Sequence, residues 1–311
     1  FDEGSLHLPF ATSLRMGGIG YQSDAQASLK VSYNGLESYA RTLEGALTRP
    51  WPAYEALGLA QDGEFQQLST SLLQIENEFY GTIRPKRSIR PGERPLHALG
   101  ERGVEYVEVR CLDLDPFLPL GIDASTVRFL DAFLLHCLLE DSPPDTPEEI
   151  DVLQRNRTLV VEEGRRPDLE LEEGDGGTRP LRAWARELLD ACEVTASAID
   201  AATGGRGSRA AVAEQRARVE DAGRTPSARV LAAMREQAVP FFRFAMDLSE
   251  AHAARLRAHP LDEATVARLR AECERSIAEQ ARMEAADATD FASYRRAYIE
   301  QPLLPEPAAG A

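Results

Sequence analysis

The residue types best suited to chemistry lie in the run VEYVEVRCLDLDPF, from Val104 to Phe117. Its composition favours a β-strand, in which side chains alternate between two faces. Glu108 and Arg110 then share one face, with a carboxylate and a guanidinium about 6.5 to 7 Å apart along the strand. Such a pair can act on one ligand, or it can form an ordinary ion pair on a half-exposed strand. The pattern alone leaves both interpretations open.

A glycine-rich run, GGIGY from Gly17 to Tyr21, follows shortly after Arg15. It lacks the GxGxxG spacing and the lysine of a phosphate-binding loop. Because glycine permits close backbone approach, the run either lets Arg15 and Tyr21 approach a ligand or forms a plain turn. The preceding residues 5–16 alternate loosely and include Pro9, which predicts an extended edge strand.

The run LLQIENEFY, from Leu72 to Tyr80, also has a period of two. One face of a strand here would carry Glu76, Glu78 and Tyr80. Neighbouring carboxylates repel each other unless solvent or a cation separates them. The pattern therefore fits a solvated edge strand or a strand that faces a metal ion.

A basic segment with several prolines follows directly, and it contains Arg84, Lys86, Arg87 and Arg90. The chain is acidic, with a formal net charge of −16, and only two of its 35 lysines and arginines are lysine. A rigid basic segment in such a chain is a candidate grip for phosphate oxygens, with Lys86 as a point charge. The alternative is a solvated loop that makes surface ion pairs.

Four further patterns predict the elements that position these residues. A capping pair at Asn34 and Glu37 begins a helix that ends before Pro50, and Asp123 caps a second helix. Two short strands are expected within residues 157–171. The sequence beyond Thr178 has helical periodicity and predicts four or five helices with essentially no sheet. The predicted class is α+β, with a sheet domain over 1–175, a helical region over 176–302 and a disordered tail over 303–311.

Composition excludes several partners. The charge of −16 disfavours nucleic acid and anionic membranes. No apolar run reaches the roughly 18 to 20 residues that span a bilayer, and no signal peptide is recognisable, so a cytosolic protein is expected. The four cysteines form no CxxC pair, which favours reduced structural thiols over disulfides or a zinc site.

Three long runs occur in the order LHLPFATSLRMGGIGY, LQIENEFYGTIRPKR and EYVEVRCLDLDPF. Together they resemble the proteobacterial type of glutamate–cysteine ligase, also called γ-glutamylcysteine synthetase. The resemblance continues through RFLDAF, EGRRP and EAADATDFA, so it spans most of the chain. It implies a fold similar to glutamine synthetase, with an antiparallel sheet around a metal and nucleotide site and an additional helical part.

The resemblance also implies an activity. Members couple ATP cleavage to joining the γ-carboxylate of glutamate to the amine of cysteine through a γ-glutamyl phosphate, the first step of glutathione biosynthesis. The implied small molecules are glutamate, cysteine, ATP and Mg²⁺ or Mn²⁺, in a cytoplasmic enzyme for which we favour a monomer.

Site roles are carried over residue by residue. The EVR segment implies that Glu108 is a metal ligand and that Arg110 is the catalytic contact to the transferred phosphate. Tyr21 and Tyr80 match positions that line the cysteine pocket. Arg15 matches an arginine that holds a substrate carboxylate.

The basic segment also matches the family, and we assign Arg84, Lys86 and Arg87 to ATP phosphates from their charge. Family members carry a further N-terminal part with most of the acidic metal ligands. The chain starts at Phe1 without a methionine, so a C-terminal fragment that is inactive alone is expected.

Two other functions stay open. One is a related carboxylate–amine ligase with a different amine substrate. The other is a non-catalytic interaction module that acts through the helical half.

Overall fold

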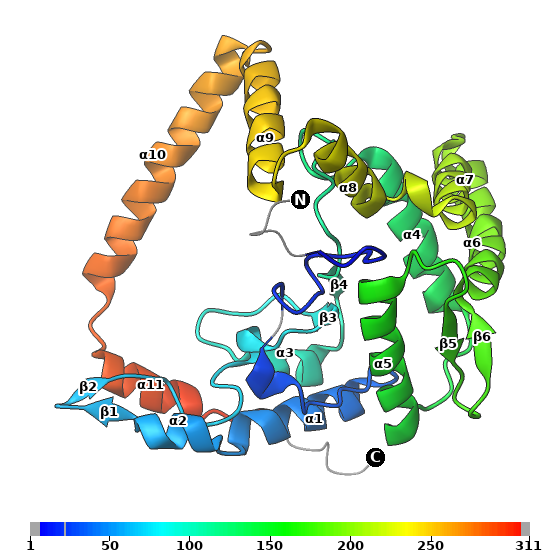
Figure 1. Cartoon of the computed structure of the whole chain (residues 1–311). Coiled ribbons are helices and arrows are strands. Elements are labelled where there is room, and N and C mark those ends of the chain that lie inside the picture. Colours follow the sequence, from blue (N-terminus) through cyan, green and yellow to red (C-terminus); the bar gives the residue numbers. More distant parts are fainter. Residues whose placement is uncertain (1–6, 22, 306–311) are drawn as a thin grey trace.

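The computed structural model describes residues 7–21 and 23–305 (Figure 1). The helices are α1 (Leu36–Thr48), α2 (Pro52–Leu57), α3 (Pro95–Arg102), α4 (Ala124–Leu139), α5 (Pro147–Glu163), α6 (Leu181–Thr203), α7 (Gly207–Glu220), α8 (Pro226–Gln237), α9 (Phe241–Arg257), α10 (Glu263–Ala286) and α11 (Phe291–Ile299), with short 3₁₀ turns η1 (Asp24–Gln26), η2 (Glu76–Glu78) and η3 (Ala222–Arg224). The strands are β1 (Ala60–Gln61), β2 (Glu64–Phe65), β3 (Ile83–Lys86), β4 (Tyr106–Val109), β5 (Glu170–Glu172) and β6 (Thr178–Pro180).

The strands of the described residues form three separate antiparallel pairs, β1–β2, β3–β4 and β5–β6. In the β3–β4 pair, Arg84 lies opposite Glu108 and Lys86 lies opposite Tyr106. Residues directly opposite each other in an antiparallel pair project to the same face. This register therefore brings the predicted basic segment beside the predicted EVR strand.

A first hydrophobic core lies next to the β3–β4 pair. It gathers α1, α3 and the segment 72–79, where Leu43, Leu72, Leu73 and Leu96 are each at most 2% exposed. Leu303 and Leu304 pack against the same core. The boundary predicted for a disordered tail at 303 thus falls inside a packed segment, while residues 306–311 lie outside the described residues.

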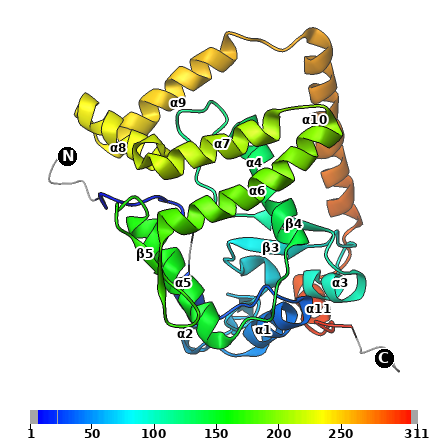
Figure 2. The ribbon, with the colours of Figure 1, turned by 90° about the vertical axis from the view of Figure 1, so that its right-hand side faces the viewer.

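A second core lies between α4, α6 and α7, which run side by side in Figure 2. Ala132, Cys192 and Val212 are buried there, with Phe129 packed against them. Asp123 caps α4 as predicted, because its Oδ1 atom accepts the Thr126 amide at 2.8 Å. Helical spacing predicts a buried stripe of Leu130, Leu134, Cys137 and Leu138 on this helix. The prediction is wrong for Cys137 and Leu138, which are exposed. The structure buries the face of Phe129 and Ala132 and leaves Leu138 78% exposed.

The chain then returns to the first core by way of α8, α9, α10 and α11. In Figure 1, α10 runs apart from the other elements and connects the end of α9 to α11, which lies beside β1 and β2. Among its described residues, α10 buries none. Between Thr178 and residue 305, where the described part of the chain ends, there are thus six α-helices rather than four or five. Across the described part of the chain, none of the helices combines the length and the apolar character that crossing a membrane would require.

The predicted strand over 72–80 is wrong. Leu72 and Leu73 donate their amides to the end of α1, at Arg49 O and Ala46 O, and η2 follows. Glu76 turns inward and pairs with Arg94 at 2.9 Å. The amides of Leu72 and Leu73 therefore bond to carbonyls at the end of α1 and are not available to a neighbouring strand. The alternation of apolar and polar residues reflects this irregular packing against α1.

Three other local predictions need correction. Of the two strands expected within 157–171, the first is instead the end of α5, a helix that Thr146 caps with proline at its first position, and the second is present only from Glu170, as β5. Gly35, not Asn34, is the N-cap of α1, and the Asn34 amide binds Ser142 Oγ at 2.9 Å. No strand occurs over 7–16 in the part of the chain that the structure describes, and residues 5–6 lie outside it.

Candidate active site

The β3–β4 pair places the Glu108 carboxylate between two cations. Arg110 Nε lies 2.9 Å from Glu108 Oε1, and Lys86 Nζ lies 3.7 Å from Glu108 Oε2. The three side chains are 27% to 34% exposed, so they stand at the edge of the solvent. The strand periodicity predicted this shared face for Glu108 and Arg110.

Two polar side-chain atoms of this cluster are buried and have no hydrogen-bond partner among the described residues. Glu108 Oε2 and Arg110 Nε are inaccessible to solvent and make no hydrogen bond to any described residue. Arg110 and Glu108 are therefore held mainly by charge. A buried oxygen with unused lone pairs is the kind of atom that an additional cation or donor would satisfy.

The charges also control protonation. Burial favours the neutral acid and on its own raises the pKa of Glu108, but Arg110, Lys86 and Arg84 together outweigh it, so this pKa is lowered. Burial disfavours the Arg110 cation, yet its hydrogen bond to Tyr21 and its attraction to the Glu108 carboxylate raise the pKa of its guanidinium. Glu108 is therefore an anion and Arg110 a cation throughout the neutral range.

Arg15 and Tyr21 lie against Arg110, and Tyr80 packs on Tyr21. An Arg110 guanidinium nitrogen donates to the Tyr21 hydroxyl. The Tyr21 ring lies 4.5 Å from the Tyr80 ring, and the Arg15 guanidinium lies 4.6 Å from the Tyr21 ring centre. Arg15 Nε in turn donates to the Arg110 carbonyl at 2.5 Å. The structure thus joins Glu108 and Lys86 to all four residues in one cluster.

Arg84 and Arg87 have different surroundings from Lys86. The Arg84 side chain is buried, and its two terminal nitrogens donate to the carbonyls of Glu76 at 2.9 Å and Asn77 at 3.3 Å. Arg87 lies 3.8 Å from Glu105 in a half-exposed ion pair. The phosphate contacts of all three residues stay predictions.

These basic residues nevertheless line one pocket of about 180 Å³ between β3, β4, α1 and α3. Its walls combine Arg84, Lys86 and Arg87 with the rings of Tyr39 and Tyr106 and with Leu96. Whole small-molecule sites occupy about 300 Å³ or more. This pocket can therefore hold part of a nucleotide rather than all of it.

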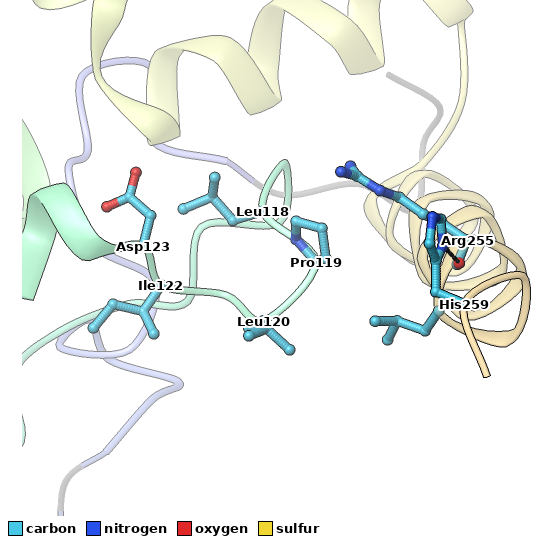
Figure 3. A pocket seen from close by; sticks show the side chains of 8 residues that line it. Leu118, Pro119, Leu120, Ile122, Asp123, Arg255 and His259 are labelled. Carbon is cyan, nitrogen blue, oxygen red and sulfur yellow. Dashed lines mark hydrogen bonds between the residues drawn. The ribbon is translucent and has the colours of Figure 1, made fainter. Parts of the chain in front are cut away.

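A larger cavity of about 390 Å³ lies elsewhere, between the loop after β4 and the end of α9 (Figure 3). Its lining includes Leu118, Leu120, Ile122, Arg255 and His259. None of the residues predicted for the site lines it. Leu120 is 73% exposed and Ile122 is 41% exposed, so the cavity is a shallow apolar depression.

The described residues contain no group of three or more His, Cys, Asp or Glu side chains that could hold a metal ion by themselves. Glu108 would therefore be a single protein ligand here. All four cysteines are free thiols, but only Cys192 has the buried, structural position that was predicted, in the second core, whereas Cys111, Cys137 and Cys273 are exposed.

The sequence did not single out the residues that hold this cluster in place. Gln26 accepts the Tyr80 amide at 2.9 Å and donates to the Glu78 carbonyl at 2.8 Å. Asp113 accepts the Leu14 and Arg15 amides. Gln26 lies 54 residues from Tyr80, so no local spacing could reveal this contact. The acidic run LDLDP was visible, but its turn partner was not.

Comparison with solved structures defines the class. The glutamate–cysteine ligase from Francisella tularensis, solved in complex with AMP, matches 93% of this chain and 57% of its own with a TM-score of 0.84 and 35% identity. A bifunctional glutathione synthetase from Pasteurella multocida matches 80% of this chain with a TM-score of 0.52 and 20% identity, which shows the fold alone. The predicted α+β fold class, including its likeness to glutamine synthetase, is confirmed by the first match.

The sequence comparisons show the family. The family model for glutamate–cysteine ligase matches residues 1–160. The glutamate–cysteine ligase of Pseudomonas paraeruginosa is 51% identical over 298 residues, which are 96% of this chain and 56% of that protein. That of Bordetella parapertussis is 49% identical and covers 97% of this chain and 58% of its own length. The chain belongs to the glutamate–cysteine ligase family, and it spans somewhat more than half the length of these relatives.

Proposed function

We propose that this chain forms part of the active site of an enzyme that uses ATP to join the γ-carboxylate of glutamate to the amine of cysteine. The supporting observation is the single cluster of Glu108, Arg110, Lys86, Tyr21 and Tyr80 in a member of this family. Products are γ-glutamylcysteine, ADP and phosphate. A cytoplasmic, monomeric enzyme stays a prediction.

The reaction needs activation because a carboxylate is a poor electrophile. The γ-carboxylate oxygen of glutamate attacks the γ-phosphorus of ATP, and ADP leaves. The cysteine amine then attacks the acyl carbon, phosphate leaves with the electrons of the broken C–O bond, and the nitrogen loses a proton to the departing phosphate. Negative charge develops on the transferred phosphoryl group in the first step and on the acyl oxygen in the second. We assign its stabilisation to Arg110, because a fixed guanidinium stabilises such charge without reorganisation.

Glu108 fits a role as a magnesium ligand. Its buried Oε2 atom has no hydrogen-bond partner among the described residues, and its lowered pKa keeps it ionised. Magnesium is commonly held by one or two carboxylates together with substrate phosphates and water. Bound there, the ion would supply positive charge to the β and γ phosphates of ATP. Manganese prefers the same oxygen ligands.

Lys86 and the pocket beside it suit a nucleotide. Lys86 Nζ lies 3.7 Å from the Glu108 carboxylate and also lines the 180 Å³ pocket. A phosphate chain between the pocket and Arg110 would pass Lys86, whose ammonium can contact phosphate oxygens. The relative from Francisella tularensis was solved with AMP, which supports nucleotide binding by a protein of this fold.

Tyr21, Tyr80 and Arg15 suit the amino-acid substrate. The two rings form a tilted pair with one partly exposed face, since Tyr80 is 40% exposed. The Arg15 guanidinium beside them can pair with a carboxylate. We assign this corner of the cluster to cysteine.

The test is phosphate release by an enzyme of full family length that carries this chain. Wild type should release phosphate with ATP, glutamate and cysteine, and much less with other amines. Arg110→Ala should lower kcat by about 10²- to 10³-fold, the usual effect of removing one transition-state charge donor, and should change KM for cysteine far less. Arg155→Ala, which breaks an exposed ion pair with Glu172 in another part of the fold, should leave both unchanged.

Three outcomes would contradict the proposal. Faster phosphate release with another amine would favour a related ligase. An unchanged kcat in Arg110→Ala would remove Arg110 from the chemistry. A folded full-length protein without ATP-dependent phosphate release would favour a non-catalytic interaction module.

A further inference from the structure

Asp113, three residues beyond Arg110, binds a turn that is distant in sequence. Its Oδ1 atom accepts the amides of Leu14 at 3.0 Å and Arg15 at 2.8 Å. Its Oδ2 atom accepts the Ser13 hydroxyl. One carboxylate thus collects three donors from three consecutive residues, and charge-assisted bonds of this kind are about twice as strong as neutral ones.

The turn held by Asp113 carries two residues of the candidate site. Arg15 Nε donates to the Arg110 carbonyl at 2.5 Å, and the Arg15 carbonyl accepts the Tyr21 amide at 2.5 Å. The Tyr21 hydroxyl then accepts from the Arg110 guanidinium. A closed chain of contacts therefore runs from Asp113 through Arg15 and Tyr21 back to Arg110.

The rest of the segment is attached elsewhere. Thr12 donates its amide to Val161 O at 2.8 Å and its hydroxyl to Val160 O at 2.6 Å, at the end of α5. Those bonds fix the backbone at residues 11–12, but they do not determine the orientation of the backbone at Arg15. The hydrogen bonds from Ser13, Leu14 and Arg15 to Asp113 connect this turn to the loop that follows Arg110.

We propose that Asp113 is a positioning residue that fixes Arg15 and Tyr21 for the amino-acid substrate. The proposal rests on the function proposed above. Asp113 acts through the turn and touches neither the substrate nor the reacting atoms. Its loss should therefore weaken use of the substrate bound by Arg15 and Tyr21, while the nucleotide side of the cluster keeps its geometry.

The first measurement needs no catalysis. Amide hydrogen exchange should show faster exchange at Leu14 and Arg15 in Asp113→Ala, because both amides lose their acceptor. Thr12, bonded to α5, should exchange at the wild-type rate. Asp175→Ala is a matched control, because Asp175 also accepts a backbone amide in a turn, that of Gly177 at 2.9 Å, near β5 and β6. It should leave the exchange of residues 12–15 unchanged.

The second measurement is steady-state kinetics with the full-length enzyme. Asp113→Ala should raise KM for cysteine by about tenfold or more, since small misplacements of substrate-binding groups have effects of this size. KM for ATP should stay within about twofold, because the contacts of Lys86 are not affected. Asp113→Asn keeps an oxygen acceptor for both amides and should restore most of the affinity. A merely structural role would not produce this selective change with rescue.

The outcomes separate the two proposals. An inactive wild type would overturn the proposed ligase function, whereas the exchange result would still report whether Asp113 holds the turn. An active wild type with unchanged kinetics in Asp113→Ala would overturn the positioning role. Equal losses toward cysteine and ATP would also overturn it.

Discussion

Gly20 lies directly against the carbonyl of Arg15. A Cβ atom added at residue 20 would stand 1.9 Å from Arg15 O and 2.4 Å from its carbonyl carbon. Real Cβ atoms do not approach backbone atoms so closely, so only glycine fits here without a shift of the chain. The GGIGY run is thus a tight loop that folds Tyr21 back onto Arg15, rather than a phosphate-binding loop.

Gly20→Ala should therefore displace the Tyr21 ring from the Arg15 guanidinium and from Tyr80. We expect KM for cysteine to rise at least about tenfold, because these three side chains are the ones assigned to cysteine. Gly174→Ala is the control, because a Cβ there would meet nothing within 4 Å. Steady-state kinetics of the two variants check the prediction, and equal KM values for cysteine would contradict it.

Local signals in the sequence predicted the parts of this site that depend on neighbouring residues. The period of two placed Glu108 of β4 and Arg110, the residue after its end, on one face, where they pair at 2.9 Å. The capping aspartate Asp123 marked the start of α4. Both depend on geometry within a few residues, which the sequence encodes directly.

Long-range packing decided what local signals could not. Glu76 and Arg94 are 2% and 4% exposed and form a buried pair, although the pattern around Glu76 also fitted a solvated or metal-facing strand. Arg84 belongs to the same basic run as Lys86, but its guanidinium is directed to the carbonyls around η2. Which arginine is buried depends on segments that meet only after folding.

Acid should weaken the fold through Glu93. Arg102 donates to both carboxylate oxygens, at 2.7 and 2.8 Å, and the Arg90 amide donates at 2.8 Å. These bonds lower the pKa of Glu93 from its ordinary 4.5 to about 2. Because the folded pKa lies below the unfolded one, the stabilisation is fully present above about pH 4.5 and is lost as pH falls toward 2.

Glu93→Gln removes this contribution. Urea unfolding should show wild type more stable than the variant at pH 6, with a difference that shrinks by pH 3. Glu55→Gln, at an exposed position in α2, is the control and should show no such pH-dependent difference. A gap between wild type and Glu93→Gln that stays constant from pH 6 to pH 3 would contradict the prediction.

Phe244 should be the main attachment between α9 and the loop after β4. Its side chain is 1% exposed, and its ring lies 5.8 Å from that of Phe117. Phe244→Ala should lower the free energy of unfolding by about 3 to 5 kcal/mol. Phe242→Ala on the same helix removes a ring that is 74% exposed and should cost at most about 0.5 kcal/mol. Urea unfolding of both variants measures the difference, and similar midpoints would show that α9 does not pack as described.

Arg84 and Lys86 belong to the same basic segment, but we expect Arg84 to contribute to stability and Lys86 to ATP binding. Arg84→Met leaves the buried carbonyl of Glu76 and the carbonyl of Asn77 without their donor, so the free energy of unfolding should fall by about 1 to 3 kcal/mol. Lys86→Met removes a half-exposed ammonium and should change stability little. The affinity of Lys86→Met for ATP should fall about tenfold, the equivalent of one charge-assisted contact of about 1.4 kcal/mol.

Lys30→Met is the matched control, because Lys30 pairs with Asp151 at 2.6 Å and does not line the pocket. Calorimetric titration with ATP and urea unfolding distinguish the roles, and a loss of ATP affinity in Arg84→Met at unchanged stability would reverse the assignment.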